Sequence, residues 1–97
     1  GLVSKQDILA IHTDNKIIVN QNEFNIPYGN YTTPKIYQNY ISTLNLDTKE
    51  LYLFSESKKI ERFPIFSSNL YDFSTREKQT VLVVVGDQDE LLYYTVD

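Results

Sequence analysis

Hydrophobic residues in the first third of the chain lie in short β-branched or alternating segments. Two such segments, Ile8–Thr13 and Lys16–Asn20, are separated by Asp14-Asn15, a pair that tolerates the positive φ angles of a tight turn. Phe24–Ile26 alternates and leads into Pro27–Asn30, where proline and glycine are typical of a reverse turn. The pattern predicts a first hairpin, a short third strand and a turn.

The next segment has the periodicity of a helix. Thr33-Pro34 offers an N-cap hydroxyl followed by a first-turn proline. Beyond it, hydrophobic residues recur on one helical face, and these are Ile36, Tyr37, Tyr40, Ile41 and Leu44. We therefore predict one principal helix over Pro34–Asn45. The competing prediction is a strand over Tyr40–Leu46, which its β propensity favours.

A second hairpin is predicted from Leu51–Ser55 and Lys59–Phe66, which flank a short polar segment. Pro64 places the later strand at a sheet edge, because proline cannot donate a ladder hydrogen bond. The following region is polar with scattered aromatic residues. For it we predict a helical turn at Leu70, Tyr71 and Phe73, capped by Ser67 or Ser68, and then a loop over Ser74–Gln79.

The chain closes with a third hairpin, Thr80–Val85 and Leu91–Val96, joined by the loop Gly86–Glu90. Neither strand alternates between apolar and polar residues. A strand that is apolar at nearly every position is expected to be covered on both faces. Both strands are therefore predicted to be central strands of a sheet.

Together these elements predict an α+β fold in one small strand-rich domain over residues 1–97. It has a mainly antiparallel sheet of about six or seven strands with the Pro34–Asn45 helix across one face, and an all-β fold is the alternative. One helix covers only one face of Val81–Val85, so a second layer or a neighbouring subunit is expected on the other. The chain opens at Gly1 and contains no methionine, which suggests a piece of a longer protein.

Charge and length argue against two classes of partner. The formal net charge is -4, and the basic residues Lys58, Lys59 and Arg62 are interrupted by Glu56 and Glu61. Nucleic-acid binding needs a concentrated basic surface, so we predict none. The longest apolar run is far shorter than the roughly 20 residues of a spanning helix. The sequence predicts a soluble protein without membrane contact and leaves its compartment open.

Few residues offer chemistry. The chain has no cysteine, His12 is its only histidine, and its glycines, Gly1, Gly29 and Gly86, lie far apart. These facts argue against thiol chemistry, multi-histidine zinc sites and glycine-rich phosphate loops. The remaining candidates are the acidic loop Asp87–Glu90 and the carboxylate pair Asp72 and Glu77. Nothing distinguishes them from surface charge, so we predict no catalytic, metal, cofactor or small-molecule site.

The segment Phe24–Thr32, continued to Leu44, resembles a pattern of virion and phage-tail structural proteins. In that pattern a strand ends in an I-P-x-G-x-Y-T turn, and an amphipathic helix and a β-hairpin follow. The resemblance covers about Lys16 to Phe66 and implies an assembly or attachment part. In this turn Tyr31 is placed to staple the loop.

We therefore expect a non-enzymatic structural or protein-interaction module that binds a protein partner or a second copy of itself. One rival hypothesis is a fragment of a β-propeller scaffold, in which Leu46–Leu51 and the closing hairpin come from adjacent blades. Another is a small hydrolase or metal-binding domain that uses scattered acidic residues.

Overall fold

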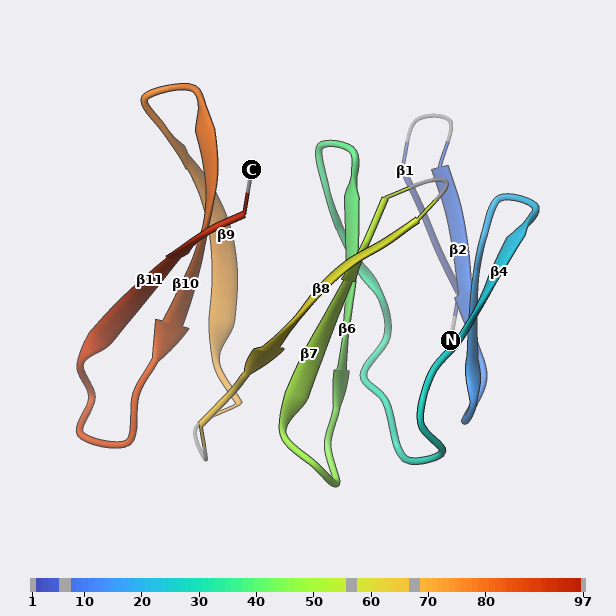
Figure 1. Ribbon diagram of the computed structural model, residues 1–97, viewed down its shortest axis with the longest axis horizontal. Helices are drawn as coiled ribbons and strands as arrows, with labels where there is room; N and C mark the ends of the chain where they lie inside the picture. Colours follow the sequence, from blue (N-terminus) through green and yellow to red (C-terminus); the bar gives the residue numbers. More distant parts are fainter. Residues whose placement is uncertain (1, 6–7, 56–57, 67–68, 97) are drawn as a thin grey trace. The chain divides into compact units, whose positions relative to one another are not determined.

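A computed structural model describes residues 2–5, 8–55, 58–66 and 69–96 of the chain. Within these residues the fold is all-β: the strands form three sheets, A, B and C, and no helix occurs (Figure 1). By its contacts the chain divides into two compact units, Gly1–Phe63 and Pro64–Asp97. Sheets A and B make up the first unit, with Pro64 of the last strand of sheet B at the boundary, and sheet C lies in the second.

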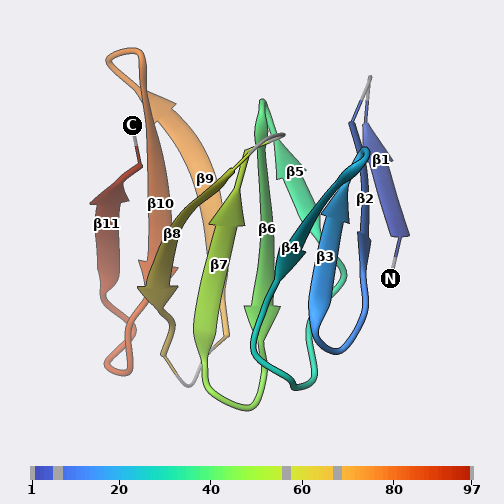
Figure 2. The same ribbon diagram turned by 45° about the vertical axis from the view of Figure 1, so that its right-hand side comes forward.

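Each sheet is a meander, because its neighbouring strands follow each other in sequence (Figure 2). Sheet A contains β1 (Leu2–Lys5), β2 (Ile8–His12), β3 (Lys16–Val19) and β4 (Asn22–Asn25). Sheet B contains β5 (Lys35–Tyr37), β6 (Tyr40–Asn45), β7 (Glu50–Phe54) and β8 (Lys59–Pro64). Sheet C contains β9 (Tyr71–Arg76), β10 (Gln79–Val85) and β11 (Leu91–Thr95).

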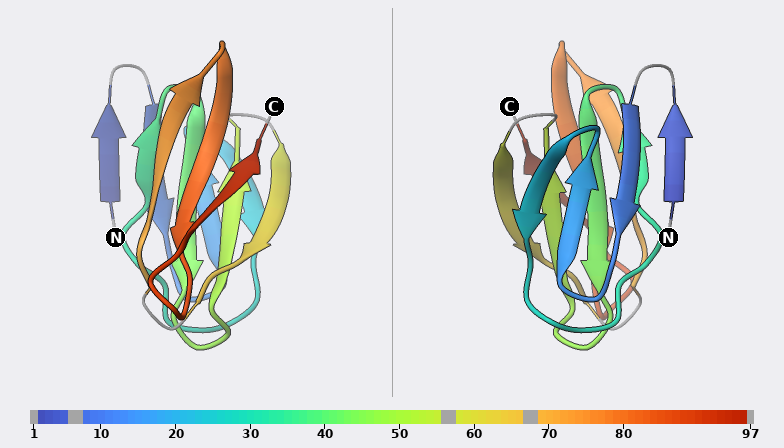
Figure 3. Two further views of the ribbon diagram at one scale, coloured as in Figure 1. Left: turned by 90° about the vertical axis from the view of Figure 1, so that its left-hand side faces the viewer. Right: turned by 90° about the vertical axis from the view of Figure 1, so that its right-hand side faces the viewer.

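One hydrophobic core lies between sheets A and B. Its buried members come from both sheets and from the segment between them, and they are Ala10, Ile17, Val19, Ile26, Ile41, Tyr52 and Phe54. Phe24 of β4 packs on Phe54 of β7, with ring centroids 5.1 Å apart. Successive side chains of a strand point to opposite faces, so β3 directs Ile17 and Val19 into this core. The two sheets therefore lie face to face (Figure 3, right).

The segment between β4 and β5 fastens the two sheets together, and we call residues 26–32 the seam. On the side of sheet A, the amide N–H of Ile26 donates to the carbonyl of Asn15 at 3.1 Å. The amide N–H of Gly29 donates to the carbonyl of Asp14 at 2.9 Å. Both acceptors lie in the turn between β2 and β3, so the predicted turn of the seam sits on the predicted turn of the first hairpin.

On the side of sheet B, the seam pairs with the end of β6. The amide N–H of Thr32 donates to the carbonyl of Leu44 at 3.0 Å, and the amide N–H of Leu46 donates to the carbonyl of Asn30 at 2.7 Å. Between these two hydrogen bonds, Tyr31 and Asn45 form an isolated antiparallel β-bridge. The seam thus acts as a short additional strand beside β6.

Asn45 is a fully buried polar residue at this junction. Its side-chain oxygen accepts hydrogen bonds from the amides of Asp47 (2.9 Å) and Thr48 (3.1 Å), and its side-chain nitrogen donates to the hydroxyl of Tyr31 (3.2 Å). Tyr31 in turn donates its hydroxyl hydrogen to the carbonyl of Pro27. Tyr31 therefore staples the turn as predicted, and Asn45 holds both Tyr31 and the β6–β7 turn.

The predicted α+β fold with a principal helix over Pro34–Asn45 is wrong. Residues of that segment form β5 and β6, which pair antiparallel with Ile36 opposite Ile41. Gln38 adopts a φ of 54° in the tight turn between them. The apolar spacing of a helix also fits two short strands joined by a two-residue turn, and β-branched and aromatic residues favour the strands. The competing strand prediction, Tyr40–Leu46, lies close to β6.

Two further expectations need correction. The helical turn at Leu70, Tyr71 and Phe73 and the loop over Ser74–Gln79 are replaced by β9, a turn at Glu77-Lys78 and the start of β10. Both turn residues have positive φ, 51° and 67°, which is typical of a tight hairpin. The proposed caps Ser67 and Ser68 lie outside the described residues. A single sheet of about six or seven strands is likewise replaced by three smaller sheets.

The closing hairpin is present, but only one of its strands is central. β10 lies between β9 and β11, whereas β11 has a neighbour on one side only among the described strands. Along β11 the side chains alternate between exposed and partly buried. The apolar run of β11 therefore does not report burial on both faces, because an edge strand can carry the same residues.

Candidate functional site

Sheet C has one buried face and one open face. Phe73, Leu82 and Val84 are buried on the first face. The register places the other face at alternate positions, with Val83 opposite Tyr93 and Val85 opposite Leu91. Leu91 and Tyr93 are 55% and 53% exposed there, two of the most exposed large apolar side chains among the described residues. The open face therefore presents apolar side chains to solvent.

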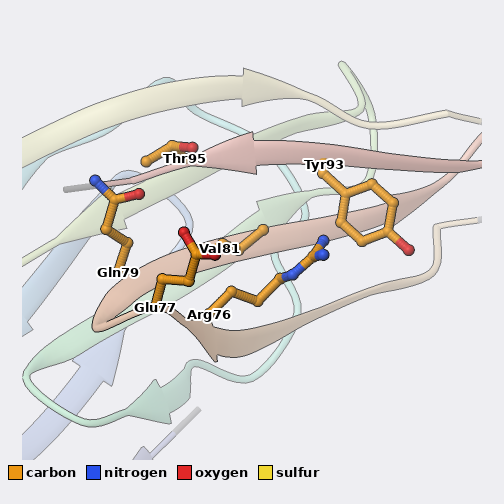
Figure 4. Close-up of a pocket in the computed structure, with 6 residues that line it drawn as sticks. All are labelled: Arg76, Glu77, Gln79, Val81, Tyr93 and Thr95. Carbon is orange, nitrogen blue, oxygen red and sulfur yellow. The ribbon is translucent and has the colours of Figure 1, made fainter.

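A shallow cavity of about 220 Å³ lies at one end of this open face (Figure 4). Its lining comes from all three strands and from the β9–β10 turn, and consists of Arg76, Glu77, Gln79, Val81, Tyr93 and Thr95. The guanidinium carbon of Arg76 lies 5.4 Å from the centroid of the Tyr93 ring. This cation–π contact holds the arginine across the sheet over the ring.

The cavity combines hydrogen-bond donors and acceptors of the kind that bind ligands. Arg76 donates hydrogen bonds, Glu77 accepts them, and Gln79 and Thr95 do both. Of the two carboxylates proposed as a pair, only Glu77 lines the cavity, while Asp72 accepts a hydrogen bond from the amide of Phe73 at 2.8 Å. The structure therefore does not bring these two acids together at this cavity.

His12 lies at the end of β2, partly exposed. Its Nδ1 atom is 3.4 Å from the carbonyl of Thr13, and its ring centroid is 6.5 Å from that of Tyr31. Partial burial, the largest cause, lowers the pKa of His12 below its ordinary 6.5. These two contacts pack the imidazole at the end of the strand.

The acidic loop between β10 and β11 is fastened by its own hydrogen bonds. The amide of Asp89 donates to the carbonyl of Gly86 at 3.1 Å, and the amide of Gln88 donates to Oε1 of Glu90 at 3.3 Å. Nowhere in the described part of the chain do three or more histidine, aspartate or glutamate side chains gather as a metal site would require. The loop therefore has the geometry of a hairpin turn.

Of the basic residues considered for phosphate binding, Arg62 is engaged with a carboxylate. The Nε atom of Arg62 lies 3.1 Å from Oε2 of Glu50 in an ion pair at the surface of sheet B. Lys58 is exposed, and the side chain of Lys59 lies outside the described residues.

Residues 2–5, 8–55, 58–66 and 69–96 contain no helix long and apolar enough to cross a membrane.

Sequence reasoning missed the cavity because it assigned Arg76 and Glu77 to a loop. The signal that could have located it is the pair Glu77-Lys78 between two β-rich segments, which marks a hairpin and aligns Arg76 with Gln79.

Comparison with protein families finds no match for this chain. Comparisons with curated proteins and with solved structures find none either.

Proposed function

We propose that this chain is a non-enzymatic interaction module built from blades of a β-propeller type scaffold. The observation that carries the proposal is the succession of meanders in the first unit. A propeller places four-stranded antiparallel sheets in sequence around a central channel. Sheets A and B each contain four strands in sequence order and pack face to face.

The position of the first strand of each sheet supports the same proposal. β1 and β5 lie against each other, as the inner strands of neighbouring blades do. The seam then runs from the last strand of sheet A to the first strand of sheet B. A Greek-key sandwich would instead exchange strands between its two sheets, whereas here every sheet keeps consecutive strands.

The binding role is supported by the open face of sheet C. Tyrosine and arginine are enriched where proteins bind each other, and Tyr93 and Arg76 lie together at the cavity. Such a fold positions side chains for many functions, so the role is argued from these residues and not from the scaffold. The virion or tail role stays a prediction that rests on the resemblance alone.

Light scattering of the purified chain tests the assembly part of the proposal. A propeller ring contains about four to eight blades, whereas the described residues form three sheets. We expect a complex with twice the mass of one chain, or a higher multiple, at about 100 µM protein. A strict monomer at that concentration contradicts assembly.

A thermal-shift titration separates this proposal from the metal-binding alternative. Calcium, magnesium and zinc are added in turn to the same preparation. We expect no more than a small change in melting temperature for each ion, because stabilisation of the folded state requires a site that binds it. A strong, saturable rise with one ion favours the alternative built on acidic residues.

A further inference from the structure

We propose that the outer edge of β11 is a docking site for an extended strand of a partner protein, which makes sheet C four-stranded. The inference names the binding site of the proposed interaction module, and in that sense it rests on the proposed function. Strand addition is an established way for sheets to bind peptides: main-chain hydrogen bonds supply affinity and alternate side chains supply specificity.

The hydrogen-bond pattern of the closing hairpin fixes which backbone groups point outward. The amide of Gly86 donates to the carbonyl of Glu90, and the amide of Val96 donates to the carbonyl of Thr80. In an antiparallel ladder bonded pairs recur at every second position. Leu91, Tyr93 and Thr95 therefore occupy the non-bonded positions opposite β10. Their N–H and C=O groups point away from the sheet, where an added strand would meet them.

β11 also lacks the charged side chains that protect sheet edges from pairing. Its sequence, Leu-Leu-Tyr-Tyr-Thr, contains no charge. Each other edge strand of the three sheets carries at least one charged residue, and examples are Lys5, Glu23, Lys35, Glu61 and Asp72. Among the described edge strands, β11 is thus the one with no charged residue to oppose pairing with another strand.

The chemistry of the occupant follows from the groups around this edge. In sheets A and B the corresponding position holds β4, of four residues, and β8, of six, so a strand of similar length fits. Apolar side chains at alternate positions would cover the exposed parts of Leu91 and Tyr93. An antiparallel strand ends beside the acidic loop Asp87–Glu90, so we assign basic residues to its C-terminal end.

The test uses the peptide Thr-Thr-Val-Thr-Val-Lys-Lys, blocked at both ends, and the full chain. Its two valines are placed opposite Tyr93 and Leu91, and its lysines face the acidic loop. We expect millimolar peptide to slow hydrogen exchange of the Leu91, Tyr93 and Thr95 amides about tenfold. The same peptide N-methylated at both valines is the matched control and leaves exchange unchanged. Equal effects of both peptides, or slowing at another edge, overturn the proposal.

Two variants at one position separate backbone docking from side-chain contact. Tyr93→Pro removes the outward N–H, while Tyr93→Ala keeps it and removes the ring. We expect the alanine variant to bind the peptide several-fold more weakly and the proline variant to lose binding. Equal binding by both variants contradicts docking through the backbone.

Protection of the three amides before any peptide is added, rising with protein concentration, identifies a second copy as the occupant and overturns the proposed partner. The light-scattering result keeps the two proposals apart. Peptide binding to a strict monomer supports the edge site while contradicting assembly. Assembly of the chain without peptide binding supports the assembly proposal and contradicts the edge site.

Discussion

Two strands of nearly the same composition have opposite environments in this protein. β7 contains Leu-Tyr-Leu-Phe at residues 51–54, and β11 contains Leu-Leu-Tyr-Tyr at residues 91–94. Leu51 and Phe54 are fully buried, whereas Leu91 and Tyr93 are more than half exposed. β7 lies between β6 and β8, while β11 has one neighbour among the described strands. An apolar run alone therefore does not determine burial, because the same residue types are enclosed in β7 and open to solvent in β11.

The largest effect is expected from the same charge placed in both strands. Leu53→Lys buries an unpaired ammonium group at a fully buried position of β7 and should cost more than about 4 kcal/mol in the free energy of unfolding. Leu91→Lys should change it by less than about 0.5 kcal/mol, because the side chain reaches water. Urea denaturation measures both. Similar losses in the two variants would show that β11 is as enclosed as β7.

Removing an aromatic ring sharpens the comparison without adding charge. Phe54→Ala leaves a cavity beside Phe24 in the core between sheets A and B, and should cost about 3–5 kcal/mol. Tyr93→Ala loses mainly the contact with Arg76, and should cost about 1 kcal/mol or less. The two denaturation midpoints give the difference. If Tyr93→Ala costs as much as Phe54→Ala, the open face of sheet C is covered in solution.

The polar junction at the end of β6 should give an intermediate effect. Asn45→Ala leaves the amides of Asp47 and Thr48 without their acceptor and the Tyr31 hydroxyl without a donor, so we expect a cost of about 2–3 kcal/mol. Asn25→Ala, at an exposed position of β4, is the matched control. Equal losses in melting temperature for the two variants would show that the hydrogen bonds of Asn45 do not stabilise the first unit.

The smallest effect concerns pH. Because burial lowers the pKa of His12, the folded state binds its proton less readily than the unfolded state. The contribution of His12 to stability is complete above the unfolded pKa of 6.5 and is lost as the pH falls below it. An NMR titration of the single imidazole should have its midpoint below 6.5, and His12→Asn should flatten the pH dependence of stability. A midpoint above 6.5 would mean that folding raises the pKa of His12, and its contribution to stability would then be lost as the pH rises instead.

Local signals located the β2–β3 and β10–β11 hairpins but missed the β5–β6 and β9–β10 hairpins, and both outcomes have physical causes. Asp14-Asn15 and Gly86–Glu90 mark turns whose flanking strands pair as expected. Ile36, Tyr37, Tyr40 and Ile41 satisfy a helical spacing and a hairpin equally, and tertiary pairing with β7 resolves the ambiguity. Periodicity within a short sequence segment cannot predict that pairing, because the partner residues lie outside the segment. Leu53 opposite Ser42 is an example.

The candidate site was less accessible to sequence reasoning than the fold. Arg76 and Tyr93 are far apart in the chain and meet only because β10 lies between their strands. Their interaction depends on register, which the sequence fixes only once the Glu77-Lys78 turn is recognised. The edge position of β11 depends on which strands are present around it, and no pattern within Leu91–Thr95 reports that.

The seam has a mechanical consequence. Its hydrogen bonds reach Asn15 on one side and Leu44 on the other, so sliding sheet A along sheet B strains both sets at once. The two sets act in series, so each carries the full force, and the loss of either set frees the seam from one sheet. We expect the first unit, pulled from its ends in a force spectrometer, to yield in one event rather than two. The seam thus converts two adjacent sheets into a single element of resistance to shear.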